Sequence, residues 1–152
     1  MDKRIEQEVS IELQQKLFCT QLELAEKYKL PAIIHCVGKW GMLLDVLKSW
    51  TSNGSLPRKF LLHSANCSSE LVEVFSELGG YFSFGMRELR TERGSQCAKL
   101  VSTDRILIES DSFPSREILD DTLQTLAEMR NENAEDLSEK IYSNFSNFYK
   151  NG

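Results

Sequence analysis

The stretch that decides the fold is Arg105–Ser115, which reads RILIESDSFPS. Three apolar residues lead directly into Glu109, Ser110 and Asp111, and Phe113-Pro114 ends the run. A strand of a parallel sheet is covered on both faces, so it stays apolar along its length. Carboxylates at its end are favourable where a metal ion or hydrogen-bond donors meet them. We therefore interpret this stretch as a buried strand that ends at the rim of a site.

The same pattern of an apolar run followed by a helical segment occurs three more times. The apolar runs lie at 32–37, 59–63 and 81–84, and the helical segments at about 41–50, 68–78 and 95–101. A long helix at 6–28 precedes the first strand, and helices at 116–130 and 135–149 follow the last. Strands that alternate with helices form a parallel sheet. The expected fold class is α/β, with four parallel βα units preceded by a helix.

Two segments are expected to differ in their exposure. In the helix at 6–28, large apolar side chains recur at helical spacing, and this stripe is predicted to face the core. Its members are Val9, Leu13, Leu17, Leu24 and Tyr28, widened by Phe18 and Leu22. The basic residues of 86–93 alternate with acidic ones. We interpret that stretch as a solvated face.

Two architectures accommodate four such units: an open doubly wound sheet, and half of a (β/α)8 barrel. A complete barrel takes about 250 residues, and this chain of 152 residues has half the units. Neither a Gly-x-Gly-x-x-Gly nor a Gly-x-x-x-x-Gly-Lys motif is present, so the nucleotide-binding open sheets lack sequence support. Residues 1–152 are expected to form one domain with a core of its own.

Composition restricts the functional class. The net charge is −5 and the isoelectric point is about 5.1, which argues against sequence-independent binding of duplex DNA through a basic face. Four cysteines without a Cys-x-x-Cys pair are typical of reduced thiols in an intracellular protein. The sequence has neither an apolar run long enough to span a membrane nor a signal peptide. We expect an intracellular protein, cytoplasmic or nuclear, with no membrane partner.

Polar side chains that can bind metals follow three of the four predicted strands. The first strand leads to His35, the second to His63, and the fourth to Glu109 and Asp111. Sites form at this carboxyl edge in both barrels and open sheets. Imidazole and carboxylate together suit Zn²⁺, Mn²⁺ or a related divalent ion, which can generate a nucleophilic water near neutral pH. Asp111 could ligate such an ion or accept a proton.

Structural explanations remain open for the same residues. A histidine at a strand end is commonly a hydrogen-bonded structural residue. Asp111-Ser112 could form a turn or a helix cap, and Glu109 could pair with an arginine such as Arg87. Cys36 and Cys67 are expected to be packed side chains rather than ligands.

Five segments together resemble the TatD family of metal-dependent deoxyribonucleases, which are amidohydrolase-like (β/α)8 barrels. FCTQLELAEKYKLPAIIHC at 18–36 is similar to the family's helix and following strand, F-x-x-Q-L-x-L-A and L-P-x-x-x-H. LLHSANCS at 61–68 stands where the family has H-C-F-x-G, and LGGYFSFG at 78–85 resembles L-G-x-Y-x-S. DRILIESD at 104–111 resembles D-R-L-L-x-E-T-D, and YSNFSNFY at 142–149 resembles the closing N-x-x-x-L-F.

The resemblance implies that the chain is the C-terminal half of the barrel. His35 and His63 would be metal ligands on its fifth and sixth strands, and Asp111 a ligand and proton acceptor on the eighth. Glu109 matches the family's glutamate and Ser110 its threonine, so both are possible supporting residues. The family cleaves phosphodiester bonds in DNA, typically as an exonuclease, with two divalent ions of the Mg, Mn or Zn class.

Departures from the family pattern set the competing hypotheses. The H-x-H motif of the first strand and the glutamate of the fourth have no counterpart, and Val37 replaces an arginine. We therefore expect a metal-dependent DNase that is weak or inactive as this shortened chain. The alternative is a catalytically degenerate half barrel that binds a partner or its own copy, because a half barrel has two open sheet edges. An unrelated α/β binding module is a third possibility.

Overall fold

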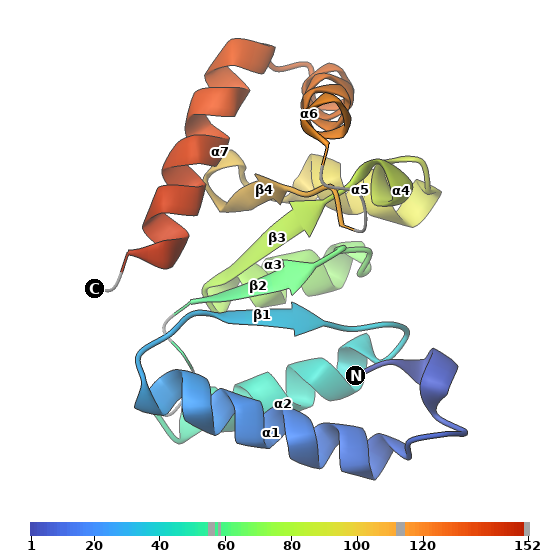
Figure 1. The fold of residues 1–152 in the computed structure, drawn as a ribbon, viewed down its shortest axis with the longest axis vertical. Coiled ribbons are helices and arrows are strands. Elements are labelled where there is room, and N and C mark those ends of the chain that lie inside the picture. Colours follow the sequence, from blue (N-terminus) through green and yellow to red (C-terminus); the bar gives the residue numbers. More distant parts are fainter. Residues whose placement is uncertain (55–56, 58, 112–114, 151–152) are drawn as a thin grey trace.

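The computed structural model describes residues 1–54, 57, 59–111 and 115–150 (Figure 1). One sheet of four parallel strands, in the order β1-β2-β3-β4, forms its centre. The strands are β1 (Ala32–His35), β2 (Phe60–His63), β3 (Gly80–Phe84) and β4 (Ile106–Ile108). The helices are α1 (Ile11–Lys27), α2 (Trp40–Ser52), α3 (Ser69–Glu77), α4 (Met86–Leu89), α5 (Glu92–Leu100), α6 (Arg116–Arg130) and α7 (Ala134–Tyr149), with 3₁₀ turns η1 (Lys3–Ile5) and η2 (Thr103–Arg105). The predicted parallel sheet of four βα units is confirmed.

The strands divide their side chains between two faces of the sheet. Even-numbered residues such as Ile34, Leu62 and Ile106 join the main core, to which each of the helices α1 to α7 contributes side chains. Odd-numbered residues lie on the opposite face, where Leu61, Tyr81 and Leu107 form a smaller cluster. Because side chains alternate along a strand, each strand contributes to both clusters. The two faces explain why the strands read as continuous apolar runs.

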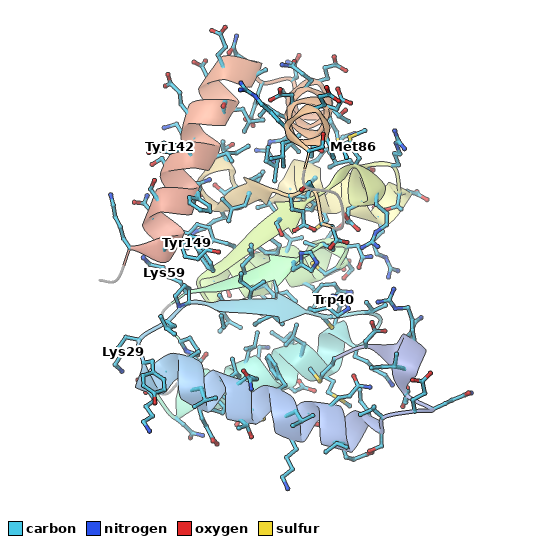
Figure 2. The ribbon with its side chains drawn as sticks, viewed as in Figure 1. Lys29, Trp40, Lys59, Met86, Tyr142 and Tyr149 are labelled. Atoms are coloured by element: carbon cyan, nitrogen blue, oxygen red, sulfur yellow. The ribbon has the colours of Figure 1, made fainter. Side chains whose placement is uncertain are left out.

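Helix α7 follows α6 and returns toward the start of the sheet (Figure 1). Its Phe148 is buried against the odd-numbered face, with its ring 5.3 Å from that of Tyr81. At the same end of the helix, the Lys59 ammonium donates to the carbonyls of Asn147 and Lys150. Figure 2 labels Lys59 at this end of the sheet. These contacts hold the helix over the amino-terminal part of the odd-numbered face.

The first helix differs from its prediction in both its start and its buried face. It begins at Ile11 instead of Glu6, because the Ser10 side chain accepts a hydrogen bond from the Leu13 amide and caps the helix there. Four members of the expected core stripe are exposed: Leu13, Leu17, Leu24 and Tyr28. Its other two large members, Phe18 and Leu22, pack inward as expected, together with Ile11 and Cys19. The core therefore uses a different face of the helix from the one with the regular apolar stripe.

The stretch at 86–93 is also not the uniformly solvated face that its charges indicate. It contains the short helix α4 and the start of α5, and within it Glu88 and Leu89 are buried. Glu88 is satisfied there because it accepts hydrogen bonds from the Gly85 amide (3.3 Å) and the Arg87 guanidinium (2.8 Å). A buried carboxylate with such donors is tolerated.

Within the described part of the chain, no helix has the length and apolar character needed to cross a membrane. The predicted intracellular location and the single-domain interpretation of residues 1–152 stay predictions.

Candidate functional site

The odd-numbered face carries two successive layers of side chains. The lower layer is apolar and consists of Ile33, Leu61, Tyr81 and Leu107. Two residues further along each strand, toward the carboxyl edge, the side chains become polar: His35, His63, Ser83 and Glu109. Since residues two apart share a face of a strand, the sequence alternation itself builds this polar rim.

Glu109 is the centre of the polar layer. Its carboxylate accepts hydrogen bonds from His63 Nδ1 (2.8 Å), from the Ser64 hydroxyl (2.7 Å) and from the Ser83 hydroxyl. Burial by itself raises the Glu109 pKa, but the hydrogen bonds from His63, Ser83 and Ser64 outweigh it and hold the pKa below its usual value. The suggested pairing of Glu109 with Arg87 is wrong, because Arg87 donates instead to Ser64 (3.3 Å) and Glu88.

His63 faces carboxylates through both of its ring nitrogens. Nδ1 donates to Glu109, and Nε2 lies 3.7 Å from Asp111 Oδ1. The hydrogen bond to Glu109 raises the pKa of His63, burial opposes this, and the charges of Glu109 and Asp111 add to the increase. The imidazole therefore has its tautomer and orientation fixed by Glu109, which leaves Nε2 directed at Asp111.

The backbone places the site residues in uncommon conformations. Ser64, directly after His63, has φ +51°, and Asp111 also has φ +51°. Few residues other than glycine adopt this left-handed region, although aspartate tolerates it better than most. Such conformations concentrate at functional sites. Ser110 is half-buried between Glu109 and Asp111, and residues 112–114, including the expected turn at Ser112, lie outside the described residues.

His35 has a different environment, created by the N-terminal segment. Its Nε2 donates to Asp2 Oδ2 at 3.0 Å, and the Arg4 guanidinium lies 3.4 Å from the same nitrogen. Arg4 also forms a two-pronged ion pair with Asp2, which is buried, and the Met1 ammonium donates to the His35 carbonyl. Hydrogen bonding to Arg4 holds the pKa of Asp2 well below its usual range. The His35 ring centroid lies 6.0 Å from that of His63.

His63 and Asp111 could supply two of the ligands that a single divalent ion needs. Two ligands of a tetrahedral ion stand roughly 3.3 Å apart, and His63 Nε2 and Asp111 Oδ1 approach this separation. Glu109 on Nδ1 supplies the outer carboxylate that commonly orients a metal-binding histidine. Among the described residues, however, no group of three or more His, Cys, Asp or Glu side chains is arranged to hold a metal ion. The two-ion arrangement of the resemblance does not fit, because Asp2 and Arg4 engage His35.

A cavity of about 450 Å³ lies below the polar layer, between the sheet and α7. The sheet contributes Ile33, Leu61, His63, Ser83, Leu107, Ile108 and Glu109, and α7 contributes Ser138, Ile141, Tyr142, Phe145 and Tyr149. Its walls are mostly apolar, and the His63–Glu109 pair lies at its polar end. The cavity therefore connects the candidate site to the space between the odd-numbered face of the sheet and α7.

Comparison with known proteins identifies the family of this chain. The model of the family described as TatD related DNase matches residues 1–150. The chain belongs to the TatD family. The Cut9-interacting protein scn1 of Schizosaccharomyces pombe is 28% identical over 176 residues, which cover 93% of this chain and 52% of that protein. The chain thus spans about half the length of this curated relative.

Three solved structures share the fold of this chain. A TatD family hydrolase from Entamoeba histolytica superposes with a TM-score of 0.82 at 18% identity, covering all of this chain and 62% of its own. A TatD homologue from Escherichia coli gives 0.78 at 24% identity, covering 91% and 57%. An uncharacterised amidohydrolase from Saccharomyces cerevisiae gives 0.83 at 14% identity, covering 98% and 63%. The predicted relation to half of a (β/α)8 barrel is consistent with these likenesses.

Several residues of the candidate site escaped the sequence interpretation. Asp2 and Arg4 reach His35 from more than thirty positions away, and Ser64 and Ser83 both donate to Glu109. Ser83 carries a signal that could have found it, because a serine inside the otherwise apolar strand β3 shares the odd-numbered face with His63 and Glu109. Asp2 carries no comparable signal, since its contact depends on the tertiary fold.

Proposed function

We propose that this chain carries part of a metal-dependent hydrolase site for phosphodiester bonds of DNA, with exonuclease-like action expected from the family. The observation that carries the proposal is the Glu109–His63–Asp111 arrangement at the carboxyl edge of a parallel sheet. His63 and Asp111 would hold a divalent ion of the Mg, Mn or Zn class. His35 would bind the ion only after the hydrogen bond between its Nε2 and Asp2 is broken. We therefore expect the activity of this chain alone to be weak or absent.

Each proposed role follows from a contact of the side chain. Glu109 holds His63 in one orientation and keeps its Nε2 directed at Asp111. Asp111, with about half of its side chain exposed, is placed to ligate an ion or accept a proton from a water at the rim. Ser110 stands between these two carboxylates as a possible supporting residue. A bound divalent ion would lower the pKa of a coordinated water.

Metal binding is tested separately from activity by following the two histidines in an NMR titration with Zn²⁺. We expect the ring signals of His63 to shift first, because within the described residues its Nε2 makes no hydrogen bond, whereas His35 must break its contact with Asp2. Asp111→Ala should lower the Zn²⁺ affinity measured at His63 by about tenfold or more, since loss of even an outer-shell partner of a metal ligand costs about 10–100-fold. Equal responses in the wild type and Asp111→Ala would refute the ligand assignment.

Cleavage is tested with end-labelled single-stranded and duplex DNA in the presence of Mg²⁺, Mn²⁺ or Zn²⁺. Asp111→Ala and His63→Asn should abolish any metal-dependent cleavage. Asp104→Ala is the matched control, because Asp104 is an exposed carboxylate at the opposite end of β4 and should leave cleavage unchanged. Metal-dependent cleavage that survives in Asp111→Ala would contradict the assignment.

The second candidate function is a catalytically degenerate half barrel that acts by binding. The engagement of His35 by Asp2 and Arg4 favours it, because both groups occupy a nitrogen that the resemblance assigns to a metal. This candidate predicts no cleavage at any metal concentration and an unfolding temperature that does not change when EDTA replaces the metal. A metal-induced increase in the unfolding temperature would favour the hydrolase site instead, since a ligand stabilises the state that binds it.

A further inference from the structure

Helix α1 presents a stripe of large apolar side chains to the outside. Leu13, Leu17, Leu24 and Tyr28 are 48%, 55%, 42% and 61% exposed. An apolar stripe at helical spacing normally faces a core, and contiguous exposed apolar surface marks an interaction site. The core of the chain packs against the other side of this helix. Among the described residues, nothing buries the stripe.

The spacing of the stripe is symmetric. The intervals between its members are four, seven and four residues, so the pattern reads the same from either end about a centre between Thr20 and Gln21. A two-fold interface needs such a self-complementary surface. If one position of the first copy contacts a second position of the other copy, the reverse contact also forms. Antiparallel pairing of two α1 helices would place Leu13 opposite Tyr28 of the second copy, and Leu17 opposite Leu24.

The charges at the two ends of the stripe obey the same symmetry. Glu12 lies beside Leu13 in the first turn of α1, and Lys29 follows Tyr28 just after the helix ends. The Lys29 ammonium pairs with Glu26 of its own chain, so in a dimer it would be shared between Glu26 and Glu12 of the second copy. In the antiparallel arrangement Glu12 of one copy faces Lys29 of the other at each end. Opposite charges at the rim of an apolar contact favour the correct partner and orientation. We propose that the α1 stripe is a homodimer surface, on which a second copy of this chain docks through its own α1.

The deciding measurement is sedimentation equilibrium over a range of concentrations, which separates the 17.4 kDa monomer from a dimer of twice that mass. We expect the wild type to dimerise and Leu17→Lys/Leu24→Lys to raise the dimer Kd by about 100-fold or more, as loss of a central apolar anchor does. Both leucines are exposed, so the variant should fold, which circular dichroism verifies.

Tyr142→Lys/Phe145→Lys is the matched control on α7, where these two side chains are 74% and 52% exposed. It should leave the dimer intact. A wild type that stays monomeric at every concentration would overturn the proposal. So would a control variant that dissociates the dimer while Leu17→Lys/Leu24→Lys does not, since the interface would then lie on α7. A monomer that binds a polypeptide carrying the rest of a barrel through α1 would also overturn it.

A charge exchange tests the antiparallel orientation without touching the apolar residues. Glu12→Lys and Lys29→Glu should each raise the dimer Kd by roughly threefold to tenfold, within the range of rim ion pairs. The double variant Glu12→Lys/Lys29→Glu should return the Kd toward the wild-type value, because the two new charges again face each other. A double variant as weak as the sum of the single ones would refute the pairing.

Discussion

Replacing Glu109 by Gln should lower the pKa of His63 and destabilise the protein. The substitution keeps the size of the side chain but removes the charge that accepts hydrogen bonds from His63, Ser64 and Ser83. A net contribution of about 1.5–3 kcal/mol is typical for a hydrogen bond to a charged group, and three donors share this carboxylate. Because the amide oxygen retains part of these bonds, we expect a loss of about 3 kcal/mol, or roughly 6–12 °C in Tm.

NMR titration provides the direct assay, because the chain has two histidines and His35→Asn identifies the remaining signal as His63. The hydrogen bond to Glu109 is the largest cause of the raised His63 pKa, and the charge of Asp111 is a smaller one. The His63 pKa should therefore fall markedly in Glu109→Gln and slightly in Asp111→Asn. An unchanged pKa in Glu109→Gln, or a larger fall in Asp111→Asn, would refute the geometry of the site.

The same pair predicts a pH window for stability. The His63 pKa is raised above its ordinary value of 6.5, so its stabilisation is complete below pH 6.5 and is lost as pH rises through the raised pKa. The Glu109 pKa is lowered below 4.5, so its contribution is present above pH 4.5 and is lost as pH falls through the lowered pKa. The difference in unfolding free energy between wild type and Glu109→Gln should be largest between these values. A difference that is constant from pH 4 to 9 would contradict the ion pair.

Two further predictions concern the scaffold. Asn144→Ala should cost about 2–4 kcal/mol in urea unfolding, because the buried amide donates to two carbonyls beside β4 (2.8 and 2.9 Å) that would lose their partner. The exposed neighbour Asn147→Ala is its control and should be within about 0.5 kcal/mol of wild type. Gly80→Ala should destabilise by about 2 kcal/mol or more, because the new methyl would lie 2.7 Å from a backbone oxygen. Gly41→Ala in α2 meets nothing within 4 Å and should stabilise slightly in the same thermal melts.

The order of strands and helices could be predicted because it rests on local signals. Short apolar runs with branched residues marked β1, β2 and β4, and helical periodicity marked the segments between them. The polar rim followed from the same logic, since His63 and Glu109 stand where apolar strands end. These features depend on residues close together in the sequence, which composition and spacing report directly.

The rest depended on contacts that spacing does not encode. The stripe of α1 looked like a core face because Leu13 and its partners have the periodicity of one, and periodicity does not distinguish a face buried within the chain from one left outside. Helix α4 was missed because Glu88 marks solvent in a pattern analysis, although its donors make burial tolerable. The contact between Asp2 and His35 spans 33 positions, so only the tertiary fold brings it about.

The two histidines explain how a partial site can be stable without a metal ion. Each has a carboxylate within hydrogen-bond distance, Asp2 for His35 and Glu109 for His63, so neither leaves buried charge uncompensated. They differ in which nitrogen the carboxylate takes. Glu109 binds Nδ1 and leaves Nε2 facing Asp111, whereas Asp2 occupies Nε2 itself. The first arrangement would orient a metal ligand and the second would block one, so the proposed metal binding depends on His63 and Asp111 before His35.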